Sequence, residues 1–127
     1  MRTVVDSSVL IAAINASDSQ HKRGEAEIRS AAKPIIVPEY VVVETCAVLV
    51  QKAGKHLADD FVREMGRNRD FRLQFSTSDF FILAAQTFLS IPNKKLSFVD
   101  CALIGLSKEY VILTFDRSLE KAIKARG

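Results

Sequence analysis

Hydrophobic residues along the chain fall into short β-branched or alternating runs, separated by longer stretches of helical spacing. The short runs at 3–5, 35–37, 71–75 and 110–115 predict four strands, and the stretches between and after them predict seven helices. The resulting order, β-α-α-β-α-α-β-α-α-β-α, requires crossover connections, which are typical of parallel strands. We therefore expect an α/β fold with a mainly parallel central sheet and helices on both faces.

Local signals predict where the helices begin and end. We expect helices over 8–15, 21–32, 39–53, 55–67, 80–90 and 117–125, and a further helix that a capping box of Ser97 and Asp100 would open. Asp18 or Ser19 is the expected N-cap of the second helix. The third is apolar almost all round, which predicts burial on most of its sides.

Composition indicates one packed domain over residues 1–127, because 48% of the residues are hydrophobic and Gly and Pro are few. The longest apolar run, 40–50, is interrupted by polar residues and is too short to span a membrane, and no secretory signal precedes it. We expect a cytoplasmic protein without membrane contact. Cys46 and Cys101 lie in helix-like apolar patterns and are expected to be small buried hydrophobes.

Charge adds a weak indication of nucleic-acid contact. The formal net charge is only +3, and the basic excess lies in the C-terminal half. Two basic groups stand out, Arg67, Arg69 and Arg72 in one, and Arg117, Lys121, Lys124 and Arg126 in the other. Such groups either follow phosphates or form a solvated face, and the solvated face is the more common case. His21, which opens a helix, is likewise expected to be a surface histidine rather than a general base.

Four acidic residues, Asp6, Glu44, Asp100 and Asp116, occupy comparable places in four separate segments. Asp6 and Asp116 each follow a strand and open a helix. Glu44 and Asp100 emerge from apolar helix faces, where an unpaired carboxylate is costly. Simpler roles exist for all four, because the three aspartates suit helix capping and Glu44 suits an ion pair with a distant base.

The predicted sheet brings these acids to one edge, because the carboxyl ends of parallel strands lie together. Clustered carboxylates repel one another unless a cation compensates, and oxygen-only ligands select hard ions such as Mg²⁺ or Mn²⁺. A site of that kind favours phosphodiester chemistry, in which the metal polarises the phosphate and activates water. No glycine-rich phosphate loop, Ser-His pair or Cys/His zinc spacing in the sequence offers a competing site.

A family resemblance rests on four segments that cover nearly the whole chain in order. They are Val-Val-Asp6-Ser-Ser-Val-Leu-Ile, Glu44 after the second strand, Ser-Phe-Val-Asp100-Cys-Ala-Leu, and Leu-Thr114-Phe-Asp116-Arg. On these segments the chain resembles PIN domains and, in length and layout, VapC-type ribonuclease toxins of prokaryotic toxin–antitoxin pairs. The resemblance implies a single PIN-like domain over residues 1–127, built as a three-layer α/β/α sandwich. Its acidic site, made of Asp6, Glu44, Asp100 and Asp116, would bind Mg²⁺ or Mn²⁺ and cleave RNA.

The resemblance also implies that Ser8 and Thr114 support the site through hydrogen bonds to carboxylates or bound water. A homodimer and a small antitoxin, whose tail occupies the active groove, are further implied. Ser118 departs from the family pattern, because many relatives carry a further acid at this position, soon after the fourth one. The sequence therefore does not decide whether a second metal ion binds. Two other hypotheses remain, a PIN-like module that binds RNA or protein without cutting, and a receiver-like domain with Asp6 as phosphoryl acceptor.

Overall fold

The helices and strands follow one another in the order that the hydrophobic pattern predicts, in a computed structural model that describes residues 1–126. The elements are β1 (Thr3–Val5), α1 (Ser7–Ile14), α2 (His21–Ser30), β2 (Ile35–Pro38), α3 (Glu39–Ala53), α4 (Lys55–Arg67), β3 (Phe71–Gln74), α5 (Ser78–Ser90), α6 (Phe98–Leu106), β4 (Val111–Leu113) and α7 (Arg117–Arg126). The expected α/β class is confirmed, with element boundaries shifted by one or two residues in places.

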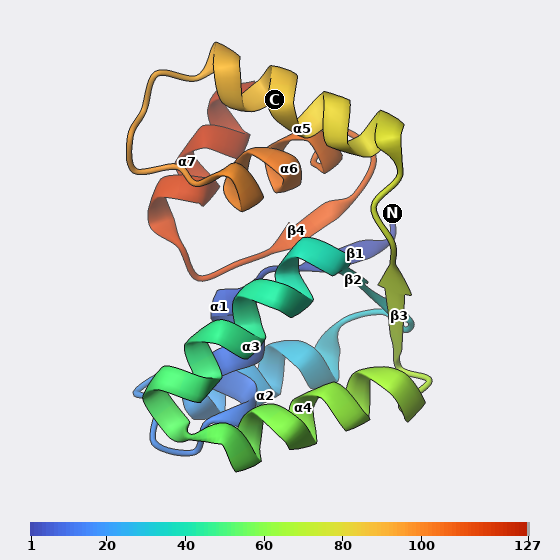
Figure 1. Cartoon of the computed structure of the whole chain (residues 1–127), viewed down its shortest axis with the longest axis vertical. Coiled ribbons are helices and arrows are strands. Elements are labelled where there is room, and N and C mark those ends of the chain that lie inside the picture. Colours follow the sequence, from blue (N-terminus) through green and yellow to red (C-terminus); the bar gives the residue numbers. More distant parts are fainter. Residues whose placement is uncertain (127) are drawn as a thin grey trace.

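The four strands form one parallel sheet in the order β3-β2-β1-β4. Val4 of β1 lies opposite Ile36 of β2 on one side and Ile112 of β4 on the other. Helices α1 to α4 cover one side of the sheet and α5 to α7 the other, which confirms the three-layer sandwich (Figure 1). The first and last strands are therefore neighbours, and the segments that follow them meet at the same edge.

The core lies where the central strands contact both helical layers. Val4, Val5 and Val37 have no exposed surface, and burying a side chain of this size contributes roughly 1.5–3 kcal/mol. Cys101 is also buried, whereas Cys46 is only partly so, and neither forms a disulfide. Within residues 1–126, no helix combines the length and the apolar character that a bilayer crossing requires.

Two local expectations prove wrong at α2 and α3. The residue before α2 is Gln20, whose side chain makes no capping hydrogen bond, while Asp18 instead accepts one from the Gln20 N–H at 2.8 Å. α3 is not buried on most sides, since Val43 and Val50 are 64% and 45% exposed. Only the opposite face of α3 packs against α1, α4 and β2.

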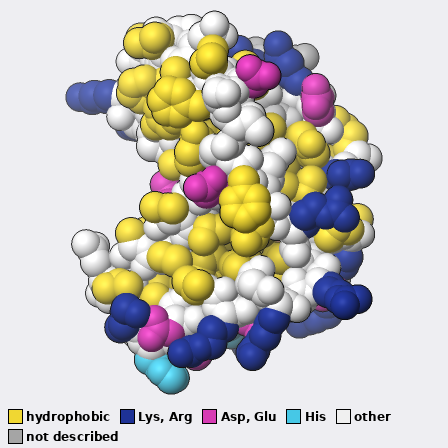
Figure 2. Space-filling model, turned by 45° about the vertical axis from the view of Figure 1, so that its right-hand side comes forward, with side chains coloured by type: hydrophobic (Ala, Val, Ile, Leu, Met, Phe, Trp, Pro, Cys, Tyr) yellow, Lys and Arg dark blue, Asp and Glu magenta, His cyan; other side chains and the backbone are white. Residues whose placement is uncertain are grey.

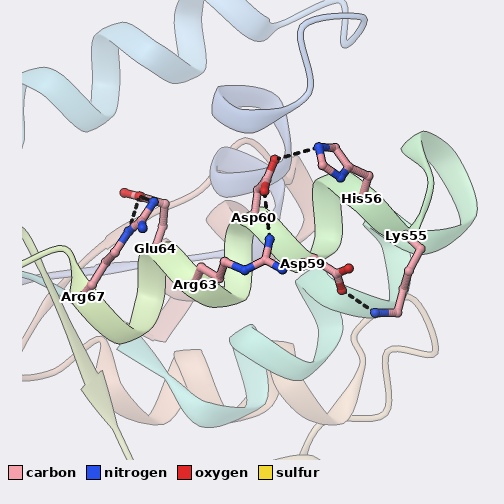
Figure 3. A network of polar contacts seen from close by, with 7 residues as sticks. All are labelled: Lys55, His56, Asp59, Asp60, Arg63, Glu64 and Arg67. Atoms are coloured by element: carbon pink, nitrogen blue, oxygen red, sulfur yellow. Dashed lines mark hydrogen bonds and ion pairs between the residues drawn. The ribbon is translucent and has the colours of Figure 1, made fainter.

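Alternating charges cover the exposed face of α4 (Figure 3). The ion pairs are Lys55 with Asp59, Arg63 with Asp60, Arg67 with Glu64, and His56 with Asp60. Exposed pairs of this kind each contribute about 0.2–1 kcal/mol. Arg67, from the first basic group, therefore belongs to a solvated, internally paired face.

Gly24 lies at the closest approach of α2 to α1. A Cβ there would lie 2.7 Å from the backbone nitrogen of Ala13 and 2.9 Å from Ala12 Cβ. We expect Gly24→Ala to lower the free energy of unfolding by about 1–3 kcal/mol, because the two helices must move apart. Denaturant unfolding measures the change. Gly66→Ala is the control, since a Cβ at Gly66 meets nothing within 4 Å, and equal stability of the two variants would contradict the prediction.

Candidate acidic active site

The four acidic residues reach the carboxyl edge of the sheet from four elements. Asp6 directly follows β1, Asp116 follows β4, Glu44 lies in the second turn of α3, and Asp100 lies in the first turn of α6. The Asp6 N–H donates to the Leu113 carbonyl at 2.9 Å, which joins the ends of β1 and β4. The sheet order thus brings Asp6 and Asp116 to the ends of neighbouring strands, and Glu44 and Asp100 come from the helical layers on opposite sides of the sheet (Figure 1).

Asp6 is the most tightly held of the four carboxylates. It is 3% exposed. Its Oδ1 accepts a hydrogen bond from the Ser7 N–H at 2.8 Å, which caps α1. Its Oδ2 accepts from Ser8 Oγ at 2.8 Å and from Thr114 Oγ1 at 2.7 Å. Hydroxyls from two elements therefore hold this side chain in a single orientation.

Glu44 is oriented by Ser7, the residue that follows Asp6 in the chain. Ser7 Oγ donates to Glu44 Oε1 at 2.5 Å and so links α1 to α3. Within residues 1–126, no Lys or Arg pairs with Glu44, so the distant ion pair does not form there. The signal available in the sequence was the pair of serines after Asp6, which places hydroxyls at two positions of the first helical turn.

Asp100 and Asp116 both cap helices. Asp100 Oδ2 accepts from the Ser97 N–H at 2.9 Å, and Ser97 Oγ accepts from the Asp100 N–H at 3.0 Å, which confirms the capping box. Asp116 Oδ1 accepts from the N–H groups of Ser118 at 2.9 Å and Leu119 at 3.2 Å. Each cap uses one carboxylate oxygen.

The other oxygens of three carboxylates remain available. Among residues 1–126, nothing donates a hydrogen bond to Glu44 Oε2, Asp100 Oδ1 or Asp116 Oδ2. Each of these side chains is thus fixed through one oxygen and open at the other. That arrangement suits a ligand for a hard cation, which needs an oriented oxygen with a free lone pair.

The pKa values of Glu44 and Asp100 show that the carboxylates interact. Burial is the main cause that raises the pKa of each, hydrogen bonds from Ser7 and Ser97 oppose it, and repulsion from Asp6 and Asp116 raises it further. Groups coupled in this way destabilise one another when ionised. A bound divalent cation would relieve that repulsion.

The donor set fits Mg²⁺ or Mn²⁺ in its chemistry, since it consists only of oxygen atoms. As the side chains are placed, no three Asp, Glu, His or Cys groups in the described part of the chain are close enough together to hold an ion. Uncompensated carboxylates repel one another. The residues therefore supply suitable ligands, which must approach one another to bind a cation.

Aromatic side chains join the two helical layers beside these acids. Tyr40 of α3 stacks on Phe80 of α5 with ring centroids 5.7 Å apart, and its edge contact with Phe98 of α6 spans 6.0 Å. Tyr40 lies one turn before Glu44, and Phe98 lies two residues before Asp100. Aromatic pairs contribute about 0.5–1.5 kcal/mol beyond their buried area. The contacts of Tyr40 therefore help to set the spacing between α3, which carries Glu44, and α6, which carries Asp100.

The surface is hollowed between the lobe that contains α5 and the lobe that contains α3 and α4. Figure 2 shows hydrophobic side chains on both sides of this hollow and acidic side chains at its inner end. A groove elsewhere on the described surface is a different feature. It has a volume of about 670 Å³, lies between α1, α2 and α4, and contains none of the four acids.

His21 is less exposed than the sequence suggested. Its Nδ1 lies 2.8 Å from the Ala12 carbonyl oxygen, and its Nε2 lies 3.3 Å from Glu25. These contacts connect α2 to α1 and give His21 a structural role.

We expect Glu44→Gln to raise the melting temperature of the metal-free protein by about 2–5 °C near pH 7. Glutamine can still accept the Ser7 hydrogen bond, but it removes a repelled charge. Because folding raises the pKa of Glu44, its charge costs nothing below about pH 4 and progressively destabilises the fold as the pH rises through the raised value. Thermal unfolding should therefore show the difference near neutral pH and lose it in acid.

The exposed Glu109 provides a matched control for this comparison. Glu109→Gln should leave the melting temperature within about 1 °C of the parent across the same pH range. A stabilisation by Glu44→Gln that is the same in acid and at neutral pH would show that repulsion between the carboxylates is not its cause.

Comparisons with known proteins concern the family and the fold of the chain. A family model described as PIN domain matches residues 3–124. Among solved structures, VapC20 of Mycobacterium tuberculosis, described as a toxin that cleaves the sarcin–ricin loop, matches with a TM-score of 0.85 and 22% sequence identity over 94% of each chain. No curated protein matches the chain. At this identity the structural match shows a shared fold.

Proposed function

Because the chain belongs to the PIN domain family, we propose that it is a divalent-metal-dependent endoribonuclease and the toxin of a toxin–antitoxin pair. The observation that carries the proposal is the approach of Asp6, Glu44, Asp100 and Asp116 to one edge of the sheet. Three of them have an oxygen that accepts no hydrogen bond from residues 1–126. Nucleases that hydrolyse phosphodiesters use such oxygens to hold Mg²⁺ or Mn²⁺.

In this proposal the four carboxylates hold the metal, and neighbouring hydroxyls hold the carboxylates. A bound Mg²⁺ or Mn²⁺ would polarise the scissile phosphate and lower the pKa of the attacking water. Ser8 and Thr114 fix Asp6, and Ser7 fixes Glu44, so that less reorganisation is needed when the substrate binds. Hydrolysis adds water across the phosphodiester bond: the hydroxide joins the phosphorus as the bond to the leaving ribose oxygen breaks, and the proton of the water passes to that leaving oxygen.

RNA is the substrate that the fold comparison favours. VapC20 is described as cleaving the sarcin–ricin loop, which is an RNA segment, and we propose that the present chain also cuts RNA. Because such a toxin must reach its RNA, we place the protein in the cytoplasm.

Two surfaces support the proposed protein partners. The groove between α1, α2 and α4 is lined by apolar side chains, among them Ile14, Ile28 and Phe61, and by as many polar or charged ones, and it offers an anchoring surface for an antitoxin. α5 exposes Phe81, Ile82, Leu83, Phe88 and Leu89. Apolar surface of this extent on one helix is unusual in a monomer and supports a homodimer.

The test is an assay of labelled RNA with the purified protein in Mg²⁺ or Mn²⁺. Internal cleavage products support the proposal. A non-catalytic binding module instead predicts bound but intact RNA and no tight divalent site in calorimetry. The receiver-like alternative is disfavoured by the structure, because Asp6 is buried and both of its oxygens accept hydrogen bonds.

A further inference from the structure

A basic depression adjoins the acidic site at the start of α7. It has a volume of about 370 Å³ and is lined by Arg23, Phe115, Arg117, Glu120, Lys121 and Lys124. Phe115 and Arg117 flank Asp116 in the chain, so the depression begins one residue from an acidic ligand candidate. Arg23 reaches it from α2, an element that the sequence does not connect with α7.

Positive charge in this depression exceeds what its one carboxylate can compensate. Glu120 pairs with Lys124 at 3.1 Å. Within residues 1–126, no carboxylate forms an ion pair with Arg23, Arg117 or Lys121. The contrast with α4 is clear, because the basic side chains drawn there in Figure 3 have acidic partners. Uncompensated cations grouped in a concave surface attract phosphate groups.

An aromatic ring lies in the same depression. The guanidinium carbon of Arg23 lies 4.2 Å from the centroid of the Phe115 ring, which is a cation–π contact. Arg23 thus covers one face of the Phe115 ring, and because Arg23 is exposed, the outer face of its guanidinium is a flat cationic surface. Such a surface can stack on a nucleobase, and together with nearby cations it is typical of sites that bind single-stranded nucleic acid.

Hydrogen bonds tie this depression to the acidic site. The Phe115 N–H donates to Ser8 Oγ at 3.0 Å, and Ser8 Oγ in turn donates to Asp6 Oδ2 at 2.8 Å. The Asp116 N–H donates to Thr114 Oγ1 at 3.0 Å, and Thr114 also donates to Asp6. The aromatic residue and two acids therefore belong to one hydrogen-bonded unit with a fixed spacing.

We propose that this depression binds the RNA strand beside the bond to be cut. Arg117 and Lys121 contact phosphates, while Arg23, held flat on the Phe115 ring, stacks against a base of the same strand. The next phosphodiester along the strand then lies at Asp116. The role in cleavage rests on the proposed ribonuclease function, whereas the binding of RNA is tested without cleavage.

The experiment measures fluorescence anisotropy of a labelled single-stranded RNA of about 15 nucleotides, with EDTA present so that no divalent metal supports cutting. The double variant Arg117→Ala/Lys121→Ala is compared with Lys52→Ala/Arg69→Ala, which loses the same charge far from the depression. We expect about tenfold weaker binding for the first and less than a twofold change for the second. The slope of log affinity against log salt should fall by about 1.4, because each lost phosphate contact on a single strand contributes about 0.7.

Phe115→Leu separates stacking from charge. Leucine keeps the apolar contact of this position with the core but removes the flat ring. Affinity for the labelled RNA should fall by about tenfold, and the salt slope should stay as in the parent. A salt slope that falls together with the affinity would show that Phe115 acts by placing the cations, and would overturn the stacking role.

Four further outcomes decide between the proposals. If the double variant binds the labelled RNA as the parent does, the depression is not the RNA site. Loss of binding to a Glu-rich peptide with unchanged RNA affinity would assign the depression to a protein partner and overturn the inference. If the variants change RNA binding as expected but the RNA stays intact in Mg²⁺, this inference is supported and the proposed ribonuclease function is refuted. If the protein cleaves RNA and none of these variants changes the cleavage rate or the RNA affinity, the ribonuclease function is supported and this inference is refuted.

Discussion

Replacing Asp100 by Asn should lower kcat/KM for RNA cleavage by about 1,000-fold, while the protein stays folded. The amide oxygen can still accept the hydrogen bond from the Ser97 N–H, so the capping box that opens α6 is kept. What the variant loses is one negatively charged oxygen at the carboxyl edge. Single-turnover cleavage of labelled RNA measures the effect, and circular dichroism confirms the fold.

Asp79→Asn is the matched control for this variant. Asp79 also lies in the first turn of a helix, α5, but it is exposed and is not one of the four acids. The substitution removes the same charge and should change the cleavage rate by less than about twofold. If Asp100→Asn cuts RNA as well as Asp79→Asn does, the acidic residues are not the active site.

Removal of divalent ions should have an effect of similar size. We expect EDTA to reduce RNA cleavage to background, a loss of at least about 1,000-fold, and Mg²⁺ or Mn²⁺ to restore it. The same ions should raise the melting temperature, because an ion at 100 times its Kd stabilises the folded state by about 2.7 kcal/mol. Relief of the repulsion that raises the pKa values of Glu44 and Asp100 is part of this gain.

Variants at the acids separate a metal bound at this site from ions bound elsewhere. Glu44→Gln should lose most of the increase in melting temperature that Mg²⁺ produces, and Asp79→Asn should keep it. RNA cleavage that persists in EDTA would refute a metal-dependent mechanism. A Mg²⁺ effect of equal size in both variants would place the ion away from the acidic site.

The order of elements was predictable because each strand and helix leaves a periodic pattern of hydrophobic residues in its own segment. The parallel arrangement followed from the alternation of strands with helix pairs. Exposure was harder to predict, as α3 shows. Its apolar residues Val43 and Val50 face outward, and a residue's own segment does not reveal which side of a helix another element will cover.

The candidate acids were also predictable, but their partners were not. Capping and metal binding looked like alternatives in the sequence, whereas in the structure Asp100 and Asp116 cap with one oxygen and keep the other available. The bond from Ser7 to Glu44 and the contact of Arg23 with Phe115 join segments that lie far apart in the chain. Such contacts depend on how helices pack, which hydrophobic periodicity does not encode.

The hydrogen bond between Asp6 and Thr114 spans 108 positions of the chain. A growing polypeptide on the ribosome therefore cannot complete the hydrogen bonds of its first acid until the last strand has emerged and docked beside β1. Chains released early, before β4, would lack the catalytic arrangement even if their first half were folded. The topology thus delays completion of the acidic site until translation of the domain is nearly finished.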